Sequence, residues 1–322
     1  MMNRTTLHCL RMGALALAFA TSLAHAGKIE YVDKFASSDG VVAMLYGEST
    51  MFADAYREKI VKDGLTAGGN STTWRYLQAK THTPTVSRME YAYNKDGQLL
   101  TRVYHARSGP AMDVVIRSQN FGPSDGTPSS GSGSEGSRQY EITEDDIATD
   151  FAERSYYPAD TAFNVRAPNL PSEKSVIQSL LNKDGKDINK ADAELKIFRQ
   201  IEKDINEGVV TRGGKLTGYV SKVMCESCGP ASADLAEHFG ISGSIHQLVE
   251  PGAQMGATEA AVKESVASSN ALKTLRKSFA SEHFRVNTVT APSATRAWAT
   301  TEAVERVEAA EAGAAAEARC VQ

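Results

Sequence analysis

The chain has 322 residues, of which 41% are hydrophobic and 23% are charged, which is enough for one large domain or two modest ones. Its formal net charge of −4 excludes a protein that relies on general attraction to phosphate, because such proteins are usually basic. Any contact with nucleic acid must therefore come from a local basic patch.

The N-terminus predicts a secretory signal peptide over residues 1–26. Arg4 and Arg11 flank or precede a short apolar run over residues 12–23, and a small-x-small cleavage site ends at Ala26. We therefore expect a secreted or periplasmic protein. Loss of the two arginines changes the net charge from −4 to −6. The apolar run is too short to span a membrane, and no other stretch approaches the roughly 18–20 apolar residues that a transmembrane helix needs.

Residues 27–120 predict a smaller α+β segment. The strongest signal is a β-hairpin over residues 89–106, where two alternating runs flank Asp96-Gly97, a pair suited to the positive φ angles of a tight turn. The remaining predictions in this segment are strands at 28–32, 41–46 and 111–118 and a helix at 51–62.

A Gly/Ser-rich stretch over residues 121–138 has almost nothing to bury and predicts a flexible linker. It marks the best internal boundary, with a second domain over residues 139–295 and an Ala/Glu-rich tail over residues 296–322. The alternative is that the stretch is a long insertion within one domain.

The second domain shows helical and strand patterns in alternation, which implies α/β layering. Helix 191–206, strand 215–223, the helix that the cysteine pair opens and that ends near residue 239, and strand 244–249 follow one another with short connections. The other predictions here are helices at 144–154, 172–181, 257–268 and 271–281 and strands at 162–166 and 284–289.

The motif that carries chemistry is a pair of cysteines, Cys225 and Cys228, at the start of a predicted helix. Thiolates three residues apart lie on one side of a helix, and the helix dipole favours their anions. Asp192 and Glu194 begin the preceding predicted helix, so a single intervening strand can set the two helix N-termini side by side. Two sulfurs and a third ligand would leave the fourth position of a zinc ion open to water.

These residues resemble a known family. Asp192-Ala193-Glu194 and Cys225-Glu226-Ser227-Cys228, with the strand KLTGYVSKV between them, are similar to the motifs of the cytidine-deaminase-like superfamily, in particular the deaminase domains of bacterial polymorphic toxins. The resemblance covers residues 163–251. It implies a mixed sheet with helices packed on it, Asp192, Cys225 and Cys228 as zinc ligands and Glu194 as the general acid/base.

Two positions depart from the family pattern. Asp192 stands where the family usually has His or Cys, and a carboxylate is a harder donor for zinc. Met224 stands where the family has proline. The family's hairpin would be the one at residues 89–106 if residues 107–171 are an insertion, which would move the domain boundary.

The resemblance implies hydrolytic deamination of a nucleobase, in nucleic acid or a nucleotide, by an effector or toxin delivered into another cell. An immunity protein and the secretion machinery would then be further partners. Glu226 and Ser227 are candidate substrate contacts because they lie between the cysteines. Lys273, Arg276 and Lys277 are others, since with Phe279, Phe284 and Arg285 they form a basic-aromatic cluster suited to phosphates and stacked bases. The alternative is a solvated helix face.

Other readings of the cysteines remain open. An oxidising compartment permits a thiol–disulfide pair in a redox protein, or a structural disulfide in a non-catalytic secreted protein. His238 and His246 lie nearest in sequence and are substitutes for the third ligand, whereas His82 and His105 are expected to be structural or exposed.

Overall fold

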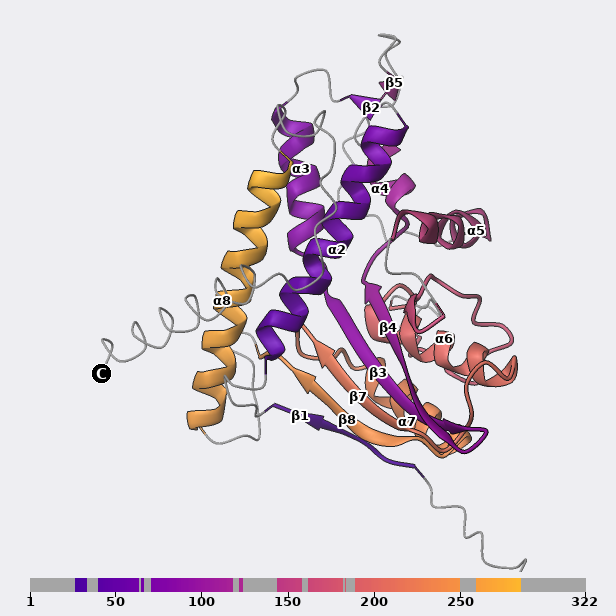
Figure 1. The fold of residues 1–322 in the computed structure, drawn as a ribbon. Coiled ribbons are helices and arrows are strands. Elements are labelled where there is room, and N and C mark those ends of the chain that lie inside the picture. The colour runs from indigo at the N-terminus through magenta and orange to yellow at the C-terminus, as the bar shows by residue number, and fades with distance from the viewer. Residues whose placement is uncertain are drawn as a thin grey trace, which may run out of the picture.

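A six-stranded mixed β-sheet with helices on both faces forms the centre of the protein (Figure 1). The computed structural model describes residues 27–33, 40–63, 65–66, 71–117, 122–123, 144–157, 162–181, 183, 189–249 and 259–284. The strand order is β1-β8-β7-β3-β4-β6, and seven α-helices are present in these ranges. The expectation of an α/β protein with a mixed sheet is therefore confirmed.

The strands of this sheet are β1 (Ile29–Val32), β3 (Val86–Lys95), β4 (Gln98–Arg107), β6 (Asn164–Arg166), β7 (Lys215–Val220) and β8 (Ser242–Gln247). A separate two-stranded sheet pairs β2 (Leu65–Thr66) with β5 (Gly122–Pro123). The helices are α2 (Val41–Lys62), α3 (Ser71–His82), α4 (Met112–Arg117), α5 (Glu144–Ala152), α6 (Ala193–Asn206), α7 (Cys228–Phe239) and α8 (Glu259–His283), and a 3-10 helix, η2, spans Glu153–Tyr156.

The predicted hairpin is confirmed and lies within this sheet. Strands β3 and β4 pair from Val86↔Arg107 to Lys95↔Gln98, and Asp96 (φ 53°) and Gly97 (φ 79°) form the turn. Strand β3 also pairs antiparallel with β7, and β1 pairs parallel with β8. Strands from both sides of residues 121–138 therefore share one sheet, so the predicted linker does not divide it. Strand β6, which lies within residues 107–171, also belongs to this sheet and pairs parallel with β4.

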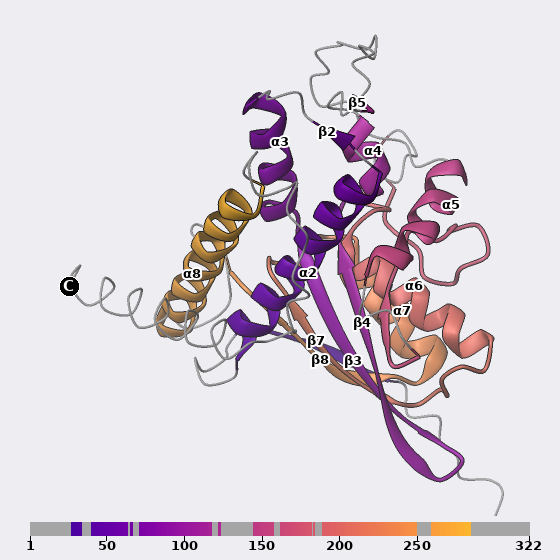
Figure 2. The ribbon, with the colours of Figure 1, turned by 45° about the horizontal axis from the view of Figure 1, so that its top comes forward.

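Two hydrophobic cores lie on opposite faces of the sheet. Helices α2, α3 and α8 pack on one face, and α6 and α7 pack on the other (Figures 1 and 2). Because side chains alternate along a strand, Leu216 and Val220 of β7 belong to the α6/α7 core, whereas Tyr219 packs against the α2 core. The sheet thus separates the α2/α3/α8 layer from the α6/α7 layer, and each layer has its own hydrophobic core.

Two predicted strands are helices. Residues 41–46 form the first turns of α2, because the buried pairs Val41/Val42 and Leu45/Tyr46 repeat with helical spacing, and a short apolar run does not distinguish the two structures. Residues 112–117 form α4. Its first N–H groups, at Met112 and Asp113, donate to the Glu153 carboxylate at 2.7 and 2.6 Å. This cap comes from a distant residue, which the local sequence does not reveal.

The helix predicted at residues 172–181 is wrong, because this segment is irregular. Two of its main-chain donors bond to other elements: Val176 N donates to Glu202 Oε1 of α6 at 2.8 Å, and Leu180 N donates to Ser227 Oγ at 3.1 Å. Of the four apolar residues that suggested a helix, only Ile177 is buried. The segment therefore lies along α6 and reaches the start of α7 as an extended strap.

The remaining differences concern the chain ends. The two helices predicted at 257–268 and 271–281 are one helix, α8, over the part that is described. The signal peptide at 1–26, most of the linker at 121–138, residues 285–289 of a predicted strand and the tail at 296–322 lie outside the described residues. Among the helices that the structure describes, none combines the length and apolar character that crossing a membrane requires.

Candidate metal centre

Two helix N-termini meet beyond the end of strand β7. Helix α6 begins after Asp192, whose extended backbone (φ −67°, ψ 143°) turns the chain into the helix. Helix α7 begins at Cys228, a few residues after β7 ends at Val220. Both helices bury apolar residues against the same face of the sheet. The predicted side-by-side arrangement of these two N-termini is therefore observed.

This arrangement brings together three potential metal ligands, which we call the donor group: Asp192, Cys225 and Cys228. Their ligand atoms all lie within 4.8 Å of one another. Asp192 Oδ2 is 2.9 Å from Cys225 Sγ and 3.8 Å from Cys228 Sγ, and the sulfurs are 3.1 Å apart. Both cysteines are free thiols. The donors of a tetrahedral zinc ion lie about 3.6–3.8 Å apart, so small shifts would let the donor group hold an ion.

Glu194 lies beside the donor group but is not part of it. Its Oε2 is 3.8 Å from Cys228 Sγ, and the residue is 4% exposed. The pKa of Glu194 is raised to about 7, because burial and the neighbouring Asp192 charge raise it more than the bonds from its own main-chain N–H and from Cys228 lower it. A carboxyl group that is half protonated near neutral pH can both accept and donate a proton.

Ionisation of the Cys228 thiol is disfavoured in the metal-free site. Its bond with Cys225 raises the pKa of the Cys228 thiol, and burial and the Glu194 charge raise it further. The side chains that shift these two pKa values are acids and thiols. A divalent cation would reverse the effect, because a thiol that coordinates a metal is deprotonated.

The loop that enters α7 is fixed from β8. Met224 N donates to Gln247 Oε1 at 2.9 Å, and Gln247 Nε2 donates to Asp33 Oδ1 at 2.5 Å. A proline at position 224 has no N–H and could not make the first bond. Met224, which stands where proline was expected, therefore makes a main-chain bond that proline could not make.

Tyr31 is a neighbour of the site that the sequence did not reveal. It comes from β1 and donates its hydroxyl to Cys228 O at 3.3 Å, and it also bonds to Ser232 Oγ. Ser232 Oγ in turn donates to Gly229 O at 2.7 Å, so these bonds clamp the first turn of α7. Burial raises the pKa of Tyr31 to about 12, which keeps it a donor. Strand alternation predicts which face it occupies but not its partner.

The predicted substrate contacts are not gathered at the donor group. Glu226 is exposed beside it, whereas Ser227 is fully buried and its Oγ accepts bonds from other segments. Lys273, Arg276 and Lys277 lie on α8, on the opposite face of the sheet (Figure 1).

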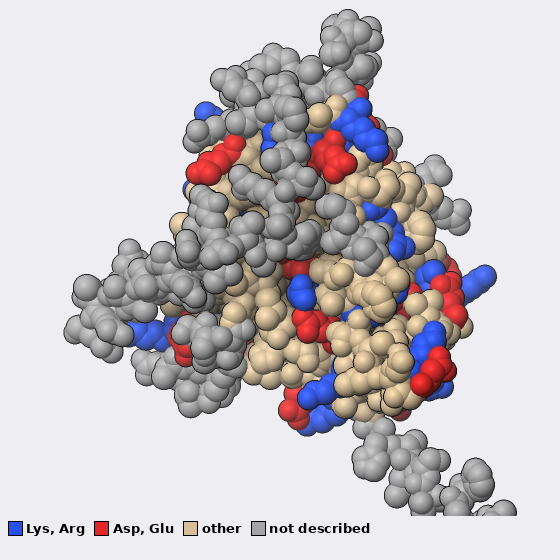
Figure 3. Space-filling view, in the orientation of Figure 1, with Lys and Arg blue, Asp and Glu red and all other residues tan. Residues whose placement is uncertain are grey.

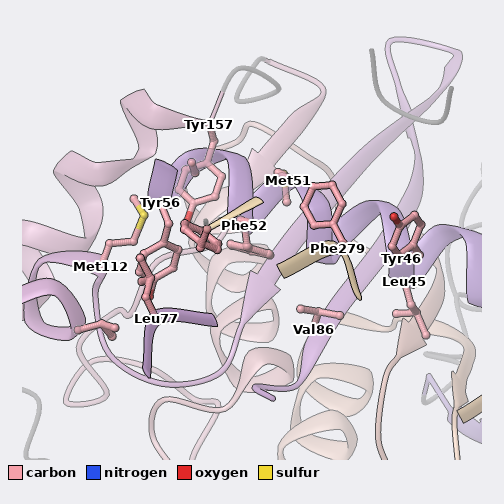
Figure 4. Close-up of a cluster of buried hydrophobic side chains, with 14 of the residues drawn as sticks. Leu45, Tyr46, Met51, Phe52, Tyr56, Leu77, Val86, Met112, Tyr157 and Phe279 are labelled. Carbon is pink, nitrogen blue, oxygen red and sulfur yellow. The ribbon is translucent and has the colours of Figure 1, made fainter. Parts of the chain in front are cut away.

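The basic-aromatic cluster on α8 does not form an open surface. Arg276 is buried and donates to Pro84 O at 2.7 Å. Phe279 points into the hydrophobic cluster of the α2 layer (Figure 4), and Phe284 is also buried. Only Lys273 and Lys277 are exposed, and Arg285 lies outside the described residues. On the face shown in Figure 3, the visible basic and acidic side chains are interspersed.

The four histidines that the sequence analysis names also lie apart from the donor group. His246 stacks on Tyr219, with ring centroids 5.4 Å apart, and so faces the α2 layer. His238 is exposed in the last turn of α7. His105 is buried and bonds through Nδ1 to Glu48 at 2.8 Å, and His82 ends α3, as expected for structural residues.

Comparison of the chain with protein-family models, with curated proteins and with solved structures gives no match. The assignment of the site therefore depends on its own geometry.

Proposed function

We propose that this protein is a zinc-dependent hydrolytic deaminase that acts on a nucleobase in nucleic acid or a nucleotide. One observation carries the proposal: Asp192, Cys225 and Cys228 converge within 4.8 Å of one another, and the Glu194 carboxylate lies beside them without joining them. Three protein ligands leave one position of a tetrahedral ion for water, as is typical of catalytic rather than structural zinc. The family resemblance of the same four residues supports this chemistry.

The roles of the side chains follow from their positions. Asp192, Cys225 and Cys228 would hold the ion, which when bound supplies a Lewis acid that lowers the pKa of a water molecule. Glu194 would accept one proton of the attacking water at Oε2 and deliver it to the ring nitrogen, and would then pass the second proton of that water to the leaving amine, which departs as ammonia. In the metal-free site the pKa of Glu194 is raised to about 7, close to the range in which general acid/base catalysis is most effective near neutral pH.

The cellular role in this proposal is that of an exported effector. The predicted signal peptide at residues 1–26 motivates export. The net charge of −4 and the burial of the aromatic side chains on α8 favour substrate contacts close to the donor group over a broad nucleic-acid platform. Free nucleotides or short single strands are therefore the first substrates to test.

Ammonia release from mixed nucleosides, nucleotides and single strands tests the proposal. Glu194→Gln should retain zinc and lose activity by on the order of 10²–10⁴-fold, the range of general acid/base contributions. Glu207→Gln is a matched control, since Glu207 is an exposed carboxylate that follows the same helix. Equal ammonia release by the parent and Glu194→Gln, with zinc bound to both, would contradict the proposal.

A thiol–disulfide function is the second candidate, because the two sulfurs are only 3.1 Å apart and a local disulfide needs little movement. The two functions differ in metal content. Protein purified under reducing conditions should contain about one zinc ion per chain if it is a deaminase of this type. A metal-free protein whose cysteines cycle with a glutathione buffer would support the redox function instead.

A further inference from the structure

Asn189, a half-buried residue, bonds to both arms of the donor group, to one through its main chain and to the other through its side chain. Asn189 lies in the turn before α6. Its carbonyl oxygen accepts a bond from Asp192 N at 2.9 Å, and its side-chain Nδ2 donates to Ser227 Oγ at 2.9 Å. Ser227 lies between the two cysteines in the sequence. The contacts of Asn189 therefore run from the segment that carries the carboxylate donor to the segment that carries both sulfur donors.

The hydrogen-bond partners of the Ser227 side chain are unusual for a residue at the start of a helix. It is the N-cap residue of α7, where a serine side chain ordinarily accepts a bond from its own helix. Here the side chain makes no such bond, and its Oγ instead accepts bonds from Asn189 Nδ2 and from Leu180 N at 3.1 Å. The residue is fully buried. The Ser227 Oγ therefore bonds two neighbouring segments to the turn between the cysteines.

The turn itself is closed by a second bond. Cys228 N donates to Cys225 O at 3.1 Å, which fixes the two cysteines relative to each other. That bond does not place the turn relative to Asp192. Two contacts of the described residues make this connection: the bond from Cys225 Sγ to Asp192 Oδ2 at 2.9 Å, and the Asn189–Ser227 bond between the segments that carry these donors.

We propose that Asn189 and Ser227 are positioning residues that set the separation between the Asp192 carboxylate and the two sulfurs. This inference rests on the proposed metal site. Groups that orient metal ligands typically contribute 10–100-fold to metal affinity. Loss of the bond should allow the carboxylate to move away from the sulfurs while the sulfurs remain together.

Zinc affinity in a double-mutant cycle tests the proposal on the full chain. Asn189→Ala and Ser227→Ala should each weaken zinc binding by about 10–100-fold. The double variant should be no weaker than the weaker single variant, because both substitutions remove the same bond. Ser265→Ala is the matched control, since Ser265 is also a buried serine whose Oγ accepts a main-chain bond, from Val249 N on the other face of the sheet at 2.9 Å.

A spectroscopic readout separates positioning from general loosening. When cobalt replaces zinc, the thiolate bands should persist in Asn189→Ala, and the visible spectrum should shift towards that of Asp192→Ala. Parent-like affinity and spectra in Asn189→Ala would overturn the proposal. Fully additive losses of affinity in the double variant would overturn it as well. If Ser227→Ala does not fold, the zinc affinity and the cobalt spectrum of Asn189→Ala test the proposal, because Asn189 is only half-buried.

Failure of the proposed function is distinguishable from failure of this inference. If the parent binds no metal, the proposed function fails, and the reactivity of the thiols in the metal-free protein tests the bond on its own. Asn189→Ala and Ser227→Ala should then react several-fold faster with an aromatic disulfide reagent than Ser265→Ala does. Rates equal to the control would overturn the positioning role, whether or not zinc binds.

Discussion

Two polar clusters contact helix α6, and they balance charge in opposite ways. The first is the donor group with Glu194. The second, which we call the ion cluster, consists of Asp150, Glu153, Arg166, Arg107 and Lys196 (all buried). In the ion cluster Arg166 bonds to Asp150, and Lys196 Nζ donates to Arg107 O at 2.9 Å and to Gly109 O at 2.8 Å.

The difference is visible in the pKa values of the buried acids. Burial alone would raise the pKa of Asp150, but Arg166 and Lys196 outweigh it and hold the pKa below its ordinary value. Burial raises the pKa of Glu194 to about 7, and its acidic neighbour adds to the rise. In the ion cluster, the Arg166 guanidinium, a fixed cation of the chain, neutralises the acid. At the donor group, a bound metal ion could neutralise the acids instead. The donor group therefore suits a metal site, whereas the ion cluster suits a structural role.

The largest expected effect is on the ion cluster. Asp150→Asn should lower the free energy of unfolding by about 3–5 kcal/mol, because removing one partner of a buried ion pair leaves the other charge uncompensated. Urea denaturation measures this. A loss below about 1 kcal/mol would contradict the structural role of the cluster.

The acid dependence of stability gives a second measure of the same pair. Because the folded-state pKa of Asp150 is lowered from 3.8, its contribution is present above that pH and is lost as the pH falls through the lowered value. Asp150→Asn should therefore be less sensitive than the parent to acid below about pH 4. An unchanged slope of stability against pH in this range would argue against the pairing.

The donor group should respond to metal instead. Zinc at 100 times its dissociation constant should stabilise the folded protein by about 2.7 kcal/mol, and a chelator should remove the gain. Cys225→Ser should abolish the dependence on zinc while leaving the metal-free melting temperature close to that of the parent. A zinc-dependent gain that persists in Cys225→Ser would place the metal elsewhere.

Helix α8 offers an intermediate effect. Arg276→Met should cost about 1–3 kcal/mol of stability, because it removes the bond from the buried Arg276 side chain to the half-buried carbonyl of Pro84. Lys277→Met, one position along and exposed, should change stability by less than about 0.5 kcal/mol. Neither Lys273→Met nor Lys277→Met should change ammonia release from single strands by more than a few-fold. A large loss of activity would restore α8 as a substrate-binding face.

A small change is expected at Asp192 in the metal-free protein. Asp192→Asn should alter the free energy of unfolding by less than about 1 kcal/mol, because it also removes a charge that disfavours ionised Glu194. The same substitution should remove most of the stabilisation by zinc. A metal-free loss as large as that of Asp150→Asn would show that Asp192 is primarily structural.

Part of this comparison was predictable from the sequence. The spacing of Asp192, Glu194, Cys225 and Cys228 and the strand between the helices predict the donor group, because helix starts and cysteine spacing are local signals. The ion cluster was not predictable, since Asp150, Arg166 and Lys196 meet only through tertiary packing. The same limit explains why α4, capped by the distant Glu153, reads as a strand, and why the strap before α6 reads as a helix although its donors bond to Glu202 and Ser227.

Elemental analysis of metal bound to the reduced, full-length protein tests the central claim most directly. The account predicts about one zinc ion per chain in the parent and in Glu194→Gln, and loss of that zinc in Cys225→Ser and Cys228→Ser. Reduced parent protein that retains no divalent metal after equilibration with zinc would contradict it.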